Sequence, residues 1–206
     1  MLFRSRPVSV WVAPGEGATD IAALAARLGA KVENGESPGA DALCIVTPLG
    51  EDATTAVVRL GLDAKRTVAL DPLFGVDSHR CLMTTPATDA RMRDAAHGLF
   101  AGDGTPVTIV HDSPGFVAQR VVAMIVSIGC DIAQQGIATP DDIDRAVVLG
   151  LGYPFGPLAW GDRLGPAKVL KVLETMHVVT GDPRYRPSLW LKRRALLGLS
   201  LLTPEN

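Results

Sequence analysis

The stretch Asp112-Ser113-Pro114-Gly115-Phe116-Val117-Ala118-Gln119-Arg120 divides the chain into two kinds of sequence. Before it, short apolar runs alternate with alanine-rich segments; after it, apolar residues recur at helical spacing. Pro114-Gly115 favours a turn that ends a strand and starts a helix with no Cβ to obstruct a close approach. The stretch therefore predicts an α/β domain over residues 1–112 and an all-helical domain over residues 113–206.

Before this stretch, the apolar runs predict strands, and the segments with apolar residues at helical spacing predict helices. We expect strands over residues 8–13, 31–33, 42–46, 67–70, 81–84 and 107–110, and helices over residues 18–28, 52–60 and 88–100. The run at residues 42–46 is apolar throughout, as in a strand that is covered on both faces. Such alternation predicts a parallel sheet wound by right-handed crossovers.

After this stretch, the pattern predicts helices over residues 116–135, 139–150, 166–179 and 187–197. The first is apolar on nearly every side, so other helices or a partner chain must surround it. Glycines and prolines at residues 152–157 predict a rigid corner, where a positive φ at Gly156 would exclude β-branched side chains. Asp144 and Asp162 lie beside these turns and are expected to accept hydrogen bonds from exposed backbone amides.

Composition excludes several classes of protein. Of 206 residues, 47% are hydrophobic and 20% are charged, with a net charge of −2, which argues against a nucleic-acid or anionic-membrane surface. No apolar run reaches the roughly 18 residues of a membrane span. The three cysteines are widely spaced within apolar runs, as in a reducing compartment. We therefore expect a cytoplasmic protein.

Five stretches of the second half resemble the C-terminal domain of 3-hydroxyacyl-CoA dehydrogenases, in order and near the family's spacing: residues 112–120, 136–146, 150–158, 162–165 and 184–188. The resemblance implies a helical domain that forms the dimer contact and closes over the acyl-CoA, after an NAD-binding Rossmann domain. Its turn signature, which we expect to be structural, comprises Pro114, Gly115, Gly152, Pro154, Gly156, Pro157 and Asp162.

The first half departs from the family in the loop that would hold the cofactor. Gly15 and Gly17 follow a strand and precede a helix, as a phosphate-binding loop requires, but Asp20 replaces the third glycine. Glu16 adds a second negative charge where a pyrophosphate would lie. Glu33, at the end of the second strand, is the candidate for binding a ribose hydroxyl. We expect this chain alone to bind no NAD.

The catalytic residues that the resemblance implies are also changed. Val68 stands where the family has its catalytic histidine, and no carboxylate follows in residues 81–85 to orient such a base. His79 is the alternative base, although it lies several positions away. Gln119 takes the place of the family's active-site asparagine and is one methylene longer. No pair of residues has metal-ligand spacing, so no metal is expected.

These observations favour a reduced Rossmann-like domain followed by a helical dehydrogenase domain. We interpret the chain as the C-terminal part of a longer NAD-dependent 3-hydroxyacyl-CoA dehydrogenase, with mainly structural and dimerising roles. The implied partners are a second copy of the chain and, in the full-length enzyme, acyl-CoA. Two alternatives stay open: a complete small dehydrogenase that uses His79 with NAD at Gly15 and Gly17, and a non-catalytic CoA-binding or subunit-interaction protein.

Overall fold

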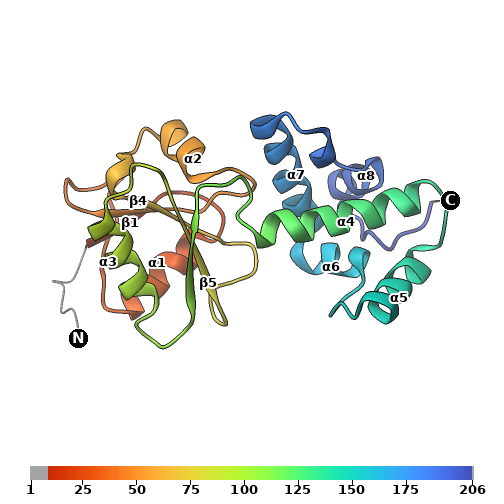
Figure 1. The fold of residues 1–206 in the computed structure, drawn as a ribbon, viewed down its shortest axis with the longest axis horizontal. Coiled ribbons are helices and arrows are strands. Elements are labelled where there is room, and N and C mark those ends of the chain that lie inside the picture. The colour runs from red at the N-terminus through yellow and green to blue at the C-terminus, as the bar shows by residue number, and fades with distance from the viewer. Residues whose placement is uncertain (1–8, 206) are drawn as a thin grey trace. The chain divides into compact units, whose positions relative to one another are not determined.

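The computed structural model describes residues 9–205. Val8, at the start of the first expected strand, lies outside the described residues. The chain forms two compact units, the first ending at Phe116 and the second beginning at Val117 (Figure 1). The sequence places the domain boundary near Asp112; the residues from Asp112 to Phe116 lie in the first unit. No helix in residues 9–205 is long and apolar enough to cross a membrane.

The first unit alternates strands and helices, as the sequence predicts, with ends shifted by one or two residues. Its elements are β1 (Ser9–Val12), α1 (Ala18–Arg27), β2 (Lys31–Glu33), β3 (Leu43–Val46), α2 (Ala53–Leu60), the 3-10 turn η1 (Ala64–Arg66), β4 (Thr67–Leu70), β5 (Arg80–Thr84), α3 (Ala90–Phe100) and β6 (Val107–His111).

The six strands form one sheet in the order β2-β1-β3-β4-β5-β6. All neighbours are parallel except β4 and β5, which are antiparallel, so the expectation of a wholly parallel sheet is wrong at this pair. A parallel connection needs a crossover of about a dozen residues or more, usually with a helix. Only residues 71–79 join β4 to β5, and they form no helix. The chain therefore turns back on itself here.

Helices cover both faces of the sheet, as the apolar strands require. Val10 and Ile45 point to the face that α1 and α3 cover, where Ile21 and Phe100 complete the core. Side chains of the other register, among them Trp11, pack with α2 on the opposite face. In Figure 1, α1 and α3 lie on one side of the strands and α2 on the other.

One buried cation joins three segments of this unit. The Arg80 guanidinium is almost completely buried and makes a bidentate ion pair with Asp103, with both N–O distances at 2.8 Å. It also donates to the carbonyl oxygens of Val76 and Phe100. The start of β5, the end of α3 and the loop after α3 are therefore held by one side chain.

The second unit consists of helices: α4 (Ala118–Gln134), α5 (Pro140–Leu151), α6 (Pro157–Leu164), α7 (Pro166–Thr180), the 3-10 turn η2 (Pro183–Tyr185) and α8 (Leu189–Leu197). The central helix α4 packs against α5, α6, α7 and α8, which explains why its sequence is apolar on most sides. The sequence missed α6. Its eight residues include Gly161 and directly follow the glycine-rich corner, so helical periodicity is too short to detect there.

Two glycines allow α4 and its neighbours to approach closely. A Cβ on Gly129 would lie 2.5 Å from Cβ of Pro157, at the start of α6. A Cβ on Gly161 would lie 2.4 Å from Leu201 and 2.7 Å from Val126. Both distances are far below van der Waals contact, so this unit needs glycine at each position.

The corner at residues 152–157 is built differently from what the sequence predicts. Gly156 has an ordinary φ of −68°, and the left-handed residue is Gly152, with a φ of 66°. Glycine is required at 156 because a Cβ there would lie 2.2 Å from Cβ of Asp144. The Asp144 carboxylate accepts hydrogen bonds from the Leu158 and Ala159 amides, both at 2.8 Å. The expected contact between Asp144 and exposed amides is therefore confirmed.

Asp162 also has the expected partners. Its carboxylate accepts a hydrogen bond of 2.8 Å from the Leu201 amide and another from the Ser200 hydroxyl. These bonds fasten the segment after α8 to the middle of α6. Of the other signature residues, Pro154 lies within the corner and Pro157 opens α6, where its missing N–H costs nothing.

Candidate active site

The cofactor crevice predicted from the sequence would lie at the carboxyl ends of β1, β3 and β4. In open α/β sheets, ligands bind where neighbouring strands connect in opposite directions, and β1 lies between β2 and β3 at such a point. Three loops meet at this edge: Pro14–Gly17 after β1, a segment from Thr47 after β3, and a segment from Asp71 after β4. The structure therefore brings Gly15 and Gly17 to the expected edge of the sheet.

Side chains of the neighbouring loops lie against both glycines. A Cβ on Gly15 would meet the Thr47 hydroxyl oxygen at 2.6 Å, so this glycine accommodates Thr47. Gly17 caps the amino end of α1 with a φ of 65°, and a Cβ on it would lie 3.6 Å from Cβ of Pro72. The space directly above the two glycines is thus shared with Thr47 and Pro72.

The charge at this edge is mainly negative. Asp20 is exposed in the first turn of α1, and Glu16 precedes the helix. A cavity of about 300 Å³ lies between α1 and residues 72–77, and its charged lining residues are Asp20, Arg27 and Asp77. Carboxylates beside a helix amino terminus compete with a phosphate for the same positive potential.

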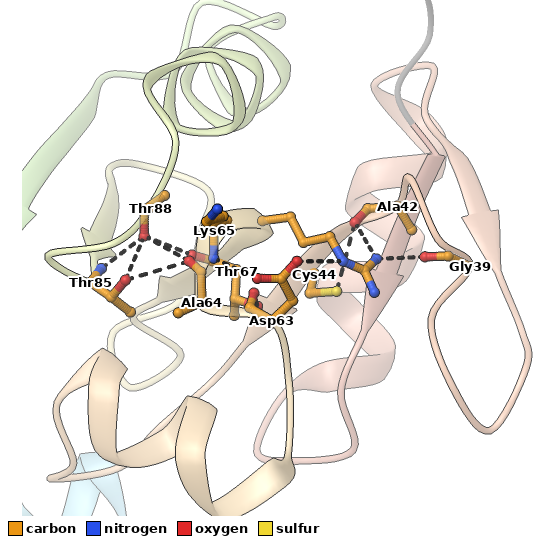
Figure 2. A network of polar contacts seen from close by, with 10 residues as sticks. Gly39, Ala42, Cys44, Asp63, Ala64, Lys65, Thr67, Thr85 and Thr88 are labelled. Carbon is orange, nitrogen blue, oxygen red and sulfur yellow. Dashed lines mark hydrogen bonds and ion pairs between the residues drawn. The ribbon is translucent and has the colours of Figure 1, made fainter.

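Glu33 is bound within its own loop. Its carboxylate accepts a 2.7 Å hydrogen bond from the Gly39 amide, and this bond is the main cause that lowers the pKa of Glu33. Arg66 donates to the carbonyl oxygens of Gly39 and Ala42, so the loop after β2 is anchored from two sides. Figure 2 shows Gly39 and Ala42 at one end of a row of polar contacts that has Thr85 and Thr88 at its other end. The carboxylate predicted to bind ribose thus stabilises a turn.

Val68, where the resemblance would place the catalytic base, lies inside the core. Val68 is completely buried in the middle of β4, and its register partner on the antiparallel strand β5 is Thr84. No residue of β5, Arg80–Thr84, carries a carboxylate. A base and an orienting acid must be within hydrogen-bonding reach of each other. The β4–β5 pair supplies neither group.

His79 lies at the outer side of the sheet. It immediately precedes β5, is exposed, and its Nε2 is 3.0 Å from the Thr108 hydroxyl on β6. Strands β3 and β4 separate β5 from β1, which at the usual strand spacing is about 14 Å. The structure therefore does not bring His79 together with Gly15 and Gly17.

The amino end of α2 is occupied by two carboxylates. Asp112 accepts hydrogen bonds from the Ala53 amide at 2.7 Å, the Thr54 amide at 3.2 Å and the Thr54 hydroxyl. Asp52 accepts from the Thr55 amide at 2.6 Å. The first three amides of α2 are thus used within the protein. Sequence reasoning missed this role of Asp112, because its partners are 58 and 59 residues away along the chain.

Residues 113–116 of the signature stretch are also fixed to the first unit. The Gly115 amide donates to the Glu51 carbonyl oxygen at 3.3 Å, and the Ser113 amide donates to the Met83 sulfur at 3.2 Å. Phe116 is completely buried and has a φ of 49°, which a non-glycine residue adopts only when its surroundings impose it. Pro114 lies in the turn between these anchors, and Gln119, completely buried, is the second residue of α4.

Other groups that could react are inactive or dispersed. Burial raises the pKa of the Cys81 thiol to about 11 and that of Cys130 to about 12, so both stay protonated and weakly nucleophilic near neutral pH. In the part of the chain that the structure describes, no three His, Cys, Asp or Glu residues gather as metal ligands would.

The sequence and fold match known dehydrogenases. The model of the 3-hydroxyacyl-CoA dehydrogenase C-terminal domain matches residues 115–200. A 3-hydroxyadipyl-CoA dehydrogenase of Escherichia coli (strain K12) is 37% identical over 158 residues, 76% of this chain and 32% of that protein. The chain is thus similar to 3-hydroxyacyl-CoA dehydrogenases, and its residues 115–200 match the C-terminal domain of that family.

Other members of this family match in the same way. A probable 3-hydroxybutyryl-CoA dehydrogenase of Bacillus subtilis (strain 168) is 35% identical over 46% of this chain and 33% of its own length. A crystal structure of 3-hydroxybutyryl-CoA dehydrogenase from Escherichia coli K12 has a TM-score of 0.66 and 34% identity, covering 74% of this chain and 31% of that one. The chain spans about a third of the length of these relatives.

A further structure shows the likeness of fold alone. The (S)-3-hydroxybutyryl-CoA dehydrogenase from Ralstonia eutropha has a TM-score of 0.74 at 22% identity, covering 96% of this chain and 71% of that chain. The predicted order, an α/β domain followed by a helical domain, is therefore confirmed, with the correction that β4 and β5 are antiparallel.

Proposed function

We propose that this chain is a non-catalytic module of a 3-hydroxyacyl-CoA dehydrogenase. The whole enzyme would oxidise a 3-hydroxyacyl-CoA to the 3-oxoacyl-CoA with NAD, and this module would supply helical packing and subunit contacts. The observation that carries the proposal is the β4–β5 pair, where the completely buried Val68 lies opposite Thr84 and no carboxylate follows on β5. A valine side chain cannot accept the proton of a substrate hydroxyl.

The geometry of the crevice supports a module that holds no NAD. Thr47 and Pro72 lie against the two glycines over which a pyrophosphate would have to sit. Asp20 adds negative charge at the amino end of α1, and the cavity beside it, at about 300 Å³, is at the lower limit for small-molecule sites. The residues present do not fit the dianionic pyrophosphate of a dinucleotide.

The helical unit, in contrast, contains the glycines and aspartates that its close helix packing requires. Gly129, Gly156 and Gly161 allow close approaches that any side chain would prevent. Asp144 and Asp162 are satisfied by backbone amides. Loss of catalytic groups in one unit, together with intact packing in the other, favours a structural role for the chain.

The direct test combines a binding and a rate measurement on the pure chain. Calorimetric titration should detect no NAD binding below millimolar concentration. NAD-dependent oxidation of 3-hydroxybutyryl-CoA should not exceed the rate without protein, because a positioned base alone contributes about 10²–10⁴ in rate. A cooperative thermal melt of the same sample shows that the chain is folded.

His79→Ala is the informative control. On our proposal this substitution changes nothing in the assay, because His79 is exposed beside β6 and far from β1. A measurable dehydrogenase rate that disappears in His79→Ala would make the chain a complete small enzyme and refute the proposal.

A further inference from the structure

A second cavity lies entirely within the helical unit, away from the residues discussed above. Its volume is about 690 Å³, in the range of small-molecule sites. The carboxyl end of α4, the second half of α7 and the start of α8 form its walls. Three of its ten lining residues are apolar, Val178, Pro187 and Leu189, and the other seven are polar or charged.

Two charged side chains and one carboxamide oxygen in this lining have no partner within residues 9–205. The Gln134 carboxamide oxygen is buried and accepts no hydrogen bond. The side chains of Asp131 and Arg186 make no hydrogen bond or ion pair within residues 9–205. A buried polar atom without a partner is uncommon, because losing its hydrogen bonds to water costs free energy.

Each of the other polar side chains of the lining has a partner within the protein. Lys192 and Glu174 form an ion pair at 3.1 Å. The His177 Nδ1 is 3.0 Å from the Asp182 carbonyl oxygen, so this nitrogen must carry the proton and donate. The Ser188 hydroxyl oxygen accepts from the Trp190 amide. The groups without a partner that the cavity offers a ligand are therefore one carboxylate, one carboxamide oxygen and one guanidinium.

These three groups complement an ammonium, a peptide group and a carboxylate. We propose that the cavity binds a short zwitterionic peptide of two residues with apolar side chains. Asp131 would bind the ammonium, Arg186 would bind the carboxylate through two parallel N–H bonds, and Gln134 would exchange a donor and an acceptor with the peptide group. The apolar side chains would cover Val178 and Leu189, which are 83% and 54% exposed.

Two other ligand classes fit this lining less well. Three or more metal-ligating side chains do not gather anywhere in residues 9–205, so a bare divalent cation lacks a ligand set. A polyphosphate such as that of CoA would bring several negative charges beside Asp131 and Glu174. The proposal is therefore independent of the acyl-CoA chemistry of the family.

Three dipeptide probes of similar size measure the contributions of the ligand's ammonium and carboxylate separately. Leucyl-leucine carries both charges, N-acetyl-leucyl-leucine lacks the ammonium, and leucyl-leucine amide lacks the carboxylate. Titration of the full chain, followed by amide chemical shifts, should give leucyl-leucine at least about tenfold higher affinity than either analogue, since each lost contact is charge-assisted. The shift changes should lie on α4, α7 and α8. Equal affinities for all three probes, or no binding at millimolar concentration, would refute the proposal.

Substitutions then assign each charge to its residue. Asp131→Asn should remove the preference for leucyl-leucine over the acetylated probe and keep the preference over the amide probe. Arg186→Gln should do the reverse. The matched controls are Asp41→Asn and Arg91→Gln, which change exposed residues of the first unit and should leave both preferences intact. If Asp131→Asn or Arg186→Gln lowers the affinity for all three probes equally, the substituted residue does not contact the matching charge of the ligand, and the assignment is wrong.

Gln134→Leu tests the buried amide separately. Leucine is similar in size to glutamine but lacks the carboxamide that would bind the peptide group, so the affinity for all three probes should fall by a similar factor. The free chain should become more stable, because a buried oxygen without a hydrogen-bond partner is removed. Unchanged affinity for every probe would show that the carboxamide has no ligand to bind.

Discussion

At the residue scale, Gly156 is needed because of a neighbouring side chain and not because of its own backbone dihedral. Its φ of −68° suits any residue, but a Cβ would overlap Asp144, which binds the first amides of α6. A new side chain must therefore displace Asp144 and break two hydrogen bonds. We predict that Gly156→Val lowers the free energy of unfolding by about 2–4 kcal/mol.

Gly150 provides the matched comparison in the helix that contains Asp144. It lies in α5, and a Cβ there would meet no atom within 4 Å. Gly150→Ala should therefore raise the free energy of unfolding by about 0.5–1 kcal/mol. Urea unfolding of the two variants checks both values. Comparable stability of Gly156→Val and wild type would mean that the corner can open without loss.

The ion pair between Arg80 and Asp103 gives a prediction about pH. The Arg80 guanidinium donates to Asp103 and holds the pKa of this carboxyl well below its ordinary range. A carboxyl whose pKa is lower in the folded state stabilises the protein above the pKa of the unfolded chain, about 3.9, and this contribution is lost as pH falls below it. Asp103→Asn should therefore destabilise the chain at pH 6 and lose less stability than wild type between pH 5 and pH 3.

The exposed pair of Arg93 and Asp94 serves as its control. Both side chains are largely in water, so Asp94→Asn should change stability little at any pH. The measurement is thermal unfolding over this pH range for wild type and both variants. Parallel pH curves for wild type and Asp103→Asn would show that the pair of Arg80 and Asp103 does not control acid stability.

At the element scale, α2 begins with two carboxylates from different parts of the chain. Asp112, at the end of β6, binds the Ala53 and Thr54 amides, while Asp52 binds the Thr55 amide. We predict that Asp112→Ala lowers the free energy of unfolding by about 1–2 kcal/mol, as loss of a strong helix cap does. Hydrogen exchange at Ala53 and Thr54 should accelerate by a corresponding factor.

Asp89 is the matched control for this cap. It occupies the N-cap position of α3 but its side chain makes no capping hydrogen bond. Asp89→Ala should therefore cost less than about 0.5 kcal/mol. If Asp112→Ala is equally mild, water replaces the carboxylate at α2 and the signature stretch is not held there.

Local sequence predicted most elements because their signals are local. Apolar runs and helix caps such as Thr139, whose hydroxyl accepts from the Asp142 amide, act over a few residues. Three features were missed or wrong: the antiparallel β4–β5 pair, whose connection is too short for a crossover, helix α6, whose eight residues are too few for a clear periodicity, and the reason for Gly156. Only the last of these depends on residues far apart in the sequence, because the side chain that a Cβ on Gly156 would overlap belongs to Asp144.

From the sequence, the candidate site could be predicted mainly by the residues in which it departs from the pattern that the resemblance implies. The replaced residues Val68 and Asp20 are visible in the sequence, whereas the contact between Gly15 and Thr47 and the engagement of Glu33 by Gly39 required coordinates. A glycine at position 15 would be required both by a bound phosphate that approaches the backbone and by a threonine side chain packed against it. A glycine pattern alone cannot distinguish these two causes.

At the scale of the whole molecule, the two units differ in how much apolar surface they expose. Among the described residues, every exposed large hydrophobic side chain except Val58 and Phe74 belongs to the helical unit. Val121 and Ile128, two turns apart on α4, are about half exposed in spite of the helices packed around the rest of that helix. Exposed apolar surface of this kind is typical of an interface.

We therefore predict that the chain forms a dimer through the helical unit. Ile128 is 55% exposed, so Ile128→Asp should leave the monomer folded while placing a charge in the interface. A buried charge without a partner costs several kcal/mol, so the dimer dissociation constant should rise by about 100-fold or more. Sedimentation velocity should show a dimer for wild type at tens of micromolar and a monomer for Ile128→Asp.

Val58→Asp separates an interface effect from a general effect of added charge. Val58 lies on α2 in the first unit and is 74% exposed, more than Ile128, so the same substitution there changes solubility and net charge in the same way. If the dimer uses α4, Val58→Asp should sediment as wild type does. If both variants dissociate, the association depends on net charge and not on the α4 surface, and a wild-type chain that sediments as a monomer at high concentration contradicts the prediction directly.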